Sequence, residues 1–306
     1  MPTTPSGDDA VTMALRSLAD PFSVEITPKE AATLPPLSEV LAAGTEVYLT
    51  FLPRTPWPDT VAVARRLVRD GLRPVPHLAA RAVPDRSTLR RRLADLAEVG
   101  VTDLLLVAGS STTPAGEFHE AAQILDSGCL EEAGIVRVGV AGHPEGSPDI
   151  DDDALATALS TKNRIARDRG LDVRIVTQFC FAPEPIVAWE RRIREAGNTL
   201  PVYVGLPGLT SPGRLLKFGL SCGVGPSLTV LRKQSGGVLK LVTTPVYRPY
   251  DTVVGLAAAV AADPHSLLCR LHFFPFGSLV ATASWASDLL GGRFEIRDRR
   301  RPDMTA

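Results

Sequence analysis

A glutamate stands in the middle of the strand-like stretch FSVEITPKE, residues 22–30. Apolar and polar residues alternate from Phe22 to Thr27, with Glu25 in the polar set, and Pro28 ends the pattern. A half-buried carboxylate costs free energy unless it is paired or used. A carboxyl group that burial keeps protonated can act as a general acid. Two interpretations are open at this point: the solvated face of an edge strand, or a catalytic acid at the mouth of a barrel.

Other polar side chains lie in or directly after later strand-like runs. These are His77 in PVPHLAAR, the small polar loop AGSSTTP (108–114), His143 in AGHPEGSPDI, Gln178 in RIVTQFCF and His272 in LHFFPFG. Taken singly, a histidine or glutamine in a strand is more often a satisfied structural group. His272 and His119 are interpreted as structural in this way, and the others are retained as candidates for a site.

The composition is that of a globular protein with a full hydrophobic core, because 44% of the 306 residues are hydrophobic and 22% are charged. The formal net charge of −1 excludes a general attraction to nucleic acid or to anionic membranes. The four cysteines form no CxxC pair, so neither a metal framework nor a disulfide is expected. The polar N-terminus is unlike a secretion signal, and no apolar run reaches roughly 18 residues. These features predict a cytoplasmic protein.

Eight apolar, β-rich runs recur along the chain with helix-like stretches between them. The runs are 22–27, 46–52, 73–79, 102–108, 136–141, 173–181, 201–206 and 269–274. Stretches such as DTVAVARRLVRDG have apolar residues at helical spacing, and TDLLLVA is apolar throughout, as parallel strands covered on both faces are. The pattern predicts an α/β fold, a single-domain (β/α)8 TIM barrel. A doubly wound sheet is the alternative, but no GxGxxG fingerprint follows the first strand.

The predicted barrel domain spans residues 21–292, between an N-terminal extension (1–20) and a basic C-terminal tail (293–306). In a parallel barrel the carboxyl ends of the strands form one mouth, where working residues gather. The alternation in the first strand then directs its apolar residues toward the helices and Glu25 into the interior. His77 and Gln178 fall near the same ends of other strands, so the candidates converge.

Six stretches resemble, in order, the motifs of the methylenetetrahydrofolate reductase family. GVAGHPEGSPDI resembles its GVAG(Y/F)PEGHP loop, RIVTQFCF its FIITQLFF strand and YVGLPGL its IPGIMP strand. PVPHLAAR takes the place of HLTC, LHFFPFG that of FHFYTLN, and FSVEITPK that of FEFFPPK. Together they extend across residues 22–290. The resemblance implies a barrel that reduces 5,10-methylenetetrahydrofolate to 5-methyltetrahydrofolate, with a reduced folate and a nicotinamide nucleotide (NADH or NADPH) as its small-molecule partners.

The resemblance also implies roles for individual residues. Glu25 matches the catalytic glutamate, which protonates the departing nitrogen so that the methylene bridge opens to a 5-iminium cation. This role predicts a pKa raised by partial burial. Gln178 matches the pterin-binding glutamine, whose amide pairs with the amide-like edge of the pterin. Phe179 and Phe181 are assigned to the same substrate site.

The flavin contacts of the family are poorly matched. Its RGD after the fourth strand is replaced by Ala108, Gly109 and Ser110, and the loop TYGAGGST is absent. GYPEGHP becomes GHPEGSP with His143, and NLKRK becomes STKNR, which keeps Lys162 and Arg164. The residues expected at the nucleotide are His77, Gly109, Ser110, His143, Lys162 and Arg164. Further basic residues that could meet phosphates or the glutamate tail are Arg54, Arg81, Lys217 and Arg248.

These departures favour a flavin-independent branch, in which the nicotinamide nucleotide gives hydride directly to the folate carbon. The two carbons must then lie about 3–3.5 Å apart at the barrel mouth. The alternative retains FAD through backbone contacts from AGSSTTP and the Lys162/Arg164 pair. Two other functions stay open: a methyltetrahydrofolate oxidase that runs the reaction in reverse, and a non-catalytic folate-binding protein. Retention of both Glu25 and Gln178 argues against the binder. The sequence indicates neither the choice between NADH and NADPH nor the oligomeric state.

Overall fold

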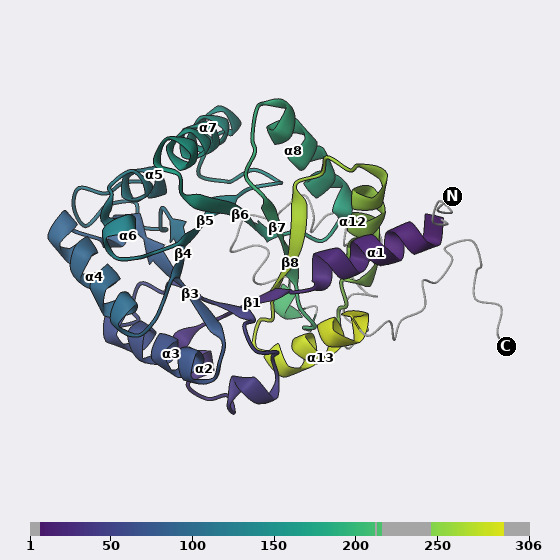
Figure 1. Cartoon of the computed structure of the whole chain (residues 1–306), viewed down its shortest axis with the longest axis horizontal. Helices are drawn as coiled ribbons and strands as arrows, with labels where there is room; N and C mark the ends of the chain where they lie inside the picture. Colours follow the sequence, from purple (N-terminus) through teal and green to yellow (C-terminus); the bar gives the residue numbers. More distant parts are fainter. Residues whose placement is uncertain (1–6, 212, 216–245, 291–306) are drawn as a thin grey trace.

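The computed structural model describes residues 7–211, 213–215 and 246–290 (Figure 1). The sequence from 220 to 249 is the least regular part of the chain, and most of it lies outside these ranges, as do Lys217 and the predicted tail 293–306.

Eight parallel strands, each paired with the next and the last with the first, close into a barrel. The strands are β1 (Ser23–Ile26), β2 (Glu46–Leu49), β3 (Arg73–Ala79), β4 (Asp103–Val107), β5 (Arg137–Gly142), β6 (Asp172–Phe179), β7 (Val202–Pro207) and β8 (Leu268–Phe274). All eight predicted runs form strands, and the third has the predicted bounds. The prediction of a (β/α)8 barrel is confirmed, and the doubly wound sheet is excluded because the sheet is closed.

Helices surround the barrel on the outside (Figure 1). They are α1 (Gly7–Ala19), α2 (Pro28–Ala31), α3 (Trp57–Arg69), α4 (Arg86–Glu98), α5 (Ala121–Leu125), α6 (Cys129–Glu132), α7 (Asp152–Arg169), α8 (Pro183–Glu195), α12 (Tyr250–Ala262) and α13 (Leu279–Leu290). Two short 3-10 turns, Leu37–Glu39 and Ala80–Ala82, follow α2 and β3. Helix α1, from the predicted N-terminal extension, packs against α12, α13 and β8. The domain limit at residue 21 stays a prediction.

Alternation along the strands separates two packed layers. Outward residues such as Val24, Ile26 and Leu104 join the large core between strands and helices. Inward residues, among them Val75 and Val176, form a smaller cluster inside the barrel. Because each strand runs the length of the barrel once, the inward polar residues lie at different positions along the barrel axis. One set lies at the amino end and another at the carboxyl mouth.

Local sequence signals set both ends of α7, the helix that carries Lys162. Asp151 caps α7, accepting a hydrogen bond from the Ala154 backbone N–H at 2.7 Å, and Gly170 ends the helix with a φ of 65°. Both are the residue types that helix ends favour.

Among the helices that the structure describes, none is both long and apolar enough to span a membrane. Cys129, Cys180 and Cys269 are free thiols, and Cys222 lies outside the described ranges. No group of three or more metal-ligating side chains occurs within those ranges.

Candidate active site

Glu25 lies inside the barrel at the carboxyl end of β1, as the alternation predicted. Its neighbours Val24 and Ile26 are buried in the outer core, whereas 11% of the Glu25 side chain remains exposed. One carboxylate oxygen, Oε1, accepts a hydrogen bond from the Thr50 hydroxyl at 2.8 Å. The other, Oε2, lies 3.4 Å from Nε2 of both His77 and His272. The carboxylate is therefore held by one hydroxyl and two imidazoles.

His272, interpreted from the sequence as a structural residue, lies directly against this carboxylate. The register pairs it with Ser23 across β8 and β1, and its Nδ1 is 2.9 Å from the Ser23 hydroxyl. The ring is fully buried and packs edge-on against Tyr48, with centroids 4.5 Å apart. The missed signal is the period of two in β8, which places Arg270, His272 and Phe274 on the inner face.

Thr50 was also missed from the sequence. It directly follows β2, where the same period of two continues the inward set of Glu46 and Tyr48. Its hydroxyl lies within 3.3 Å of the Ile26 carbonyl oxygen as well as near Glu25. A residue just past a strand end is hard to assign from the sequence, because its orientation depends on where pairing stops.

The expected raised pKa of Glu25 is contradicted. Burial alone raises the pKa of this carboxyl group, but attraction to His77 and a hydrogen bond from His272 outweigh it, so the pKa lies well below its ordinary value. Burial acts in the opposite sense on His272 and lowers the pKa of its imidazole, against the raising effect of Glu25. The sequence argument failed because it considered burial without the two histidines, which come from strands distant in the chain.

Gln178 lies at the carboxyl end of β6, where the pairing of β6 with β7 shifts register between Val176 and Phe179. It is partly exposed, and its side-chain amide makes no hydrogen bond to any residue that the structure describes. Opposite it, any side chain on Gly205 of β7 would collide with the backbone oxygens of Thr177 and Gln178. The close contact between β6 and β7 therefore requires glycine at position 205. No described residue occupies the Gln178 amide, which a ligand at the mouth could bind.

Aromatic side chains gather beside Gln178 in a cluster separate from the main core. Phe179 and Phe181 pack there edge to face with centroids 5.7 Å apart, and Leu215, Tyr247, Phe274 and Phe276 complete the cluster. Phe276 has a φ of 49°, which is unusual for a residue other than glycine. The cluster gives one side of the mouth an apolar, aromatic wall.

His143 and Lys162 meet on another side of the mouth. His143 directly follows β5, and burial together with repulsion from Lys162 lowers the pKa of its imidazole to about 4. Burial also lowers the pKa of Lys162, partly opposed by Glu120. Lys162 has no ion-pair partner within 4 Å in the described part of the chain. A half-buried cation beside a neutral imidazole suits an anionic group.

The other predicted nucleotide residues are placed differently. Arg164 does not join Lys162; it is exposed and pairs with Asp168 at 3.0 Å one helical turn on, because residues two apart point to different faces of α7. Gly109 has a φ of 92°, and Ser110 is exposed in the loop after β4. Arg81 holds that loop, donating to the carbonyl oxygens of Ser111 at 3.1 Å and His119 at 2.9 Å.

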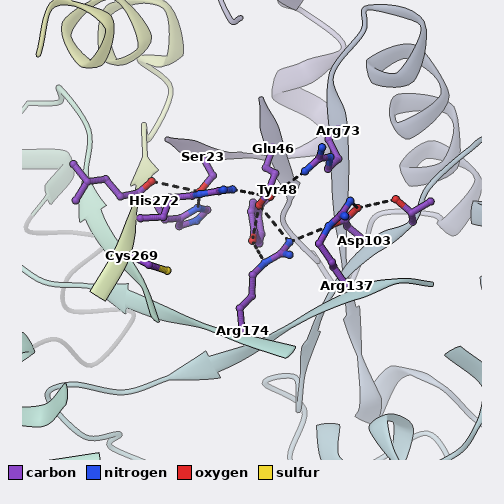
Figure 2. Close-up of polar contacts among 12 residues, drawn as sticks. Ser23, Glu46, Tyr48, Arg73, Asp103, Arg137, Arg174, Cys269 and His272 are labelled. Carbon is purple, nitrogen blue, oxygen red and sulfur yellow. Dashed lines mark hydrogen bonds and ion pairs between the residues drawn. The ribbon is translucent and has the colours of Figure 1, made fainter. Parts of the chain in front are cut away.

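A second charged cluster, here called the amino-end network, fills the opposite end of the barrel (Figure 2). Glu46 lies 2.7 Å from Arg270, 3.3 Å from Arg174 and 3.5 Å from Arg73. Asp103 binds Arg137 through two hydrogen bonds of 2.6 and 2.8 Å. Further contacts of the network join Arg174 to Asp103, Tyr48 and the Tyr203 ring. Each carboxylate here is paired with arginines.

The chain is similar to known proteins in sequence and in fold. The family model described as methylenetetrahydrofolate reductase matches residues 55–225, more than half of the chain. Methylenetetrahydrofolate reductase 1 of Schizosaccharomyces pombe is 40% identical over 70 residues, which are 22% of this chain and 11% of that protein. The match thus spans about a tenth of the length of that curated relative.

A solved structure described as a putative phosphonomutase from Burkholderia cenocepacia J2315 superposes with a TM-score of 0.50. It shares 15% sequence identity, over 94% of this chain and 100% of that one. At this identity the likeness concerns the barrel fold alone. The family model instead matches a segment that carries His77, His143, Lys162 and Gln178. The chain belongs to the methylenetetrahydrofolate reductase family.

Proposed function

We propose that this protein reduces 5,10-methylenetetrahydrofolate to 5-methyltetrahydrofolate with NADH or NADPH, and that hydride passes directly to the folate without a flavin. The observation that carries the proposal is the Glu25 carboxylate at the barrel mouth. It lies between two histidines 3.4 Å away, and the mouth also carries Gln178, whose amide has no hydrogen-bond partner among the described residues. Family membership supports the substrate class.

In the proposed reaction the bond between the methylene carbon and N10 breaks, and its electron pair stays on N10, which takes a proton. The resulting 5-iminium carbon then accepts hydride from the dihydronicotinamide ring, which leaves a methyl group and the oxidised nucleotide. The lowered pKa of Glu25 means that the resting carboxyl group is ionised. We infer that N10 takes its proton from Glu25, which is protonated transiently beside the two imidazoles. The carboxylate left behind stabilises the iminium cation.

Substrate orientation is assigned to the β6 side of the mouth. The Gln178 amide offers a donor and an acceptor to the pterin edge. Phe179 and Phe181 stand beside it in the aromatic cluster and supply a wall for the ring system. Because the amide has no competing partner among the described residues, pterin binding breaks no hydrogen bond to any of them.

FAD is the cofactor that the family implies, and the residues present fit it poorly. The loop after β4 carries no charged side chain at positions 108–110, and its carbonyl oxygens at Gly109 and Ser111 are turned toward Arg81. Arg164 is turned away and paired with Asp168. Lys162 beside His143 is a half-buried cation, and one phosphate of a nicotinamide nucleotide suits it as well as a phosphate of FAD does. These placements support direct hydride transfer.

The test is a steady-state assay with methylenetetrahydrofolate and NADH, or NADPH, with and without added FAD, on protein whose visible absorption spectrum is recorded first. We expect turnover that is unchanged by FAD and a spectrum without a flavin band. Stoichiometric flavin in the purified protein, or turnover that requires FAD, contradicts flavin independence. Absence of turnover with either nucleotide, in both directions of the reaction, contradicts the proposed activity and favours a folate-binding protein.

A further inference from the structure

A cavity of about 160 Å³ opens at the barrel mouth between the loop that follows β2 and helix α4. Its polar and aromatic lining includes Thr50, Thr55, Trp57, His77 and Arg92. The cavity lies on the β2–β3 side, whereas Gln178 and the aromatic cluster belong to β6 and the segments that follow β6, β7 and β8. The mouth therefore has two lined sides with Glu25 between them.

The inner end of this cavity reaches the two residues that hold the catalytic carboxylate. Thr50 donates to Oε1 of Glu25 at 2.8 Å, and Nε2 of His77 lies 3.4 Å from Oε2. That His77 nitrogen is buried, and its contact with Glu25 does not have the geometry of a hydrogen bond. Only the side chains of Thr50 and His77 therefore separate a group at the inner end of the cavity from Glu25.

The outer end of the cavity carries a cation without a carboxylate partner. The Arg92 guanidinium lies over the Trp57 ring, 5.4 Å from its centroid, and makes no ion pair with the residues that the structure describes. The indole is fixed by a hydrogen bond of 2.9 Å from Nε1 to Asp95, one turn further along α4. A half-buried guanidinium with fixed donors and no anion of its own is suited to a phosphate.

The size of the cavity limits what it can hold. Pockets that enclose drug-sized ligands measure roughly 300–1,000 Å³, so this one is too small for a whole dinucleotide. It can accommodate a part of one, with a ring toward Thr50 and His77 and a phosphate toward Arg92. Exposed Leu52 belongs to its lining and marks the side where the remainder of the ligand would leave.

We propose that the Trp57–Arg92 cavity binds the nicotinamide-ribose-phosphate half of the NADH or NADPH cosubstrate, on the opposite side of Glu25 from the folate. The inference rests on the proposed function and adds a site to it. Direct hydride transfer requires both substrates at the mouth together. The aromatic side near Gln178 and the Trp57–Arg92 cavity lie on the two sides of Glu25 and meet that requirement. Arg92 favours the nucleotide over the folate at the cavity because only the nucleotide carries a phosphate.

The experiment compares Arg92→Gln with Arg91→Gln, which removes the same charge from the adjacent, exposed position of α4. Calorimetric titration measures the Kd of NADH, and separately of tetrahydrofolate, for each full-length protein. We expect Arg92→Gln to weaken NADH binding at least tenfold and to leave tetrahydrofolate binding within about twofold, because a charge-assisted hydrogen bond is lost. Arg91→Gln leaves both constants unchanged, and Arg92→Lys restores part of the NADH affinity.

The outcomes separate this site from the activity. If wild-type protein binds NADH and Arg92→Gln binds it equally well, the site is wrong and the proposed function stands. If Arg92→Gln weakens tetrahydrofolate instead, the cavity holds the glutamate tail of the folate and the proposal is overturned. NADH binding that depends on Arg92 in a protein without reductase turnover supports the site and contradicts the activity. A wild-type protein that binds neither NADH nor NADPH in the same titration overturns both.

Discussion

Two charged clusters lie inside the same barrel, and they differ in the partners given to their carboxylates. At the mouth, Glu25 contacts two histidines and a threonine. At the amino end, Glu46 and Asp103 are paired with arginines, whose charge is permanent. A histidine can release or accept a proton near neutral pH, and an arginine cannot. The mouth is therefore built to move a proton, and the amino-end network to hold fixed charges in place.

The two clusters also differ in accessibility. Glu46 and Asp103 are almost fully enclosed, whereas Glu25 keeps an exposed edge and has a cavity beside its partners. Enclosed charges must satisfy one another, since water cannot. A carboxylate that keeps an edge free can meet a substrate. The same substitution, glutamate to glutamine, can thus be made at both ends with different expected consequences.

The largest effect is expected from Glu25→Gln. The substitution retains the shape and an acceptor for Thr50 but removes the acid, so turnover should fall by about 10²- to 10⁴-fold. Tetrahydrofolate binding should persist, because Gln178 and the aromatic wall are unchanged. Single-turnover measurement of NADH oxidation, with calorimetric binding as the control, tests this. Unchanged turnover would remove Glu25 from the mechanism.

Glu46→Gln is the matched substitution at the other end. It leaves Arg73, Arg174 and Arg270 around an uncharged side chain, and breaking a buried ion pair in this way lowers the free energy of unfolding by about 3–5 kcal/mol. Denaturant unfolding measures the loss. Turnover per folded molecule should stay within about twofold of wild type. A Glu46→Gln protein of full stability and low activity would contradict the assignment of a structural role to the amino-end network.

The pH dependence of stability should distinguish the clusters. Burial lowers the pKa of His272 below its ordinary 6.5. Below about pH 6.5 the imidazole therefore binds a proton in the unfolded chain but not in the folded one, and the free energy of unfolding falls as the pH drops. The slope contributed is at most about 1.4 kcal/mol per pH unit. The lowered pKa of Asp103 removes stability only below its ordinary 3.8.

His272→Asn should therefore reduce, but not abolish, the wild-type loss of stability between pH 6.5 and 5, measured by denaturant unfolding at each pH, because the lowered pKa of His143 contributes in the same window. The depressed pKa of Glu25 adds its own loss only below 4.5, outside that window. An equally steep loss in the variant would mean that another group carries it. Asp103→Asn is the control and should leave the window between pH 6.5 and 5 unchanged.

The smallest effect is expected from Arg137→Lys. Arg137 forms two parallel hydrogen bonds to Asp103, and lysine can replace one of them. The free energy of unfolding should fall by about 0.5–1.5 kcal/mol, with no change in turnover. An effect on turnover as large as that of Glu25→Gln would show that the two ends of the barrel are coupled.

The sequence predicted the barrel and part of the site. Strand-like runs recur eight times, and the third, 73–79, is reproduced residue for residue because its apolar pattern is bounded on both sides by clear breaks. The alternation around Glu25 gave its inward orientation, and resemblance singled out Gln178. The motif placed Arg164 beside Lys162 because the two residues are close in the sequence. In α7, however, residues two apart point to different faces, and Arg164 pairs with Asp168 instead.

What the sequence determined by itself is therefore the order of elements and the face on which each polar side chain lies, because these follow from local periods of two and 3.6 residues. Only the tertiary structure decided which faces meet. It brought His77 and His272 from opposite parts of the chain to one oxygen of Glu25, which reversed the expected direction of its pKa. It also placed Trp57 and Arg92 around a cavity beside them. Closure of the barrel sets these contacts, and no local pattern records them.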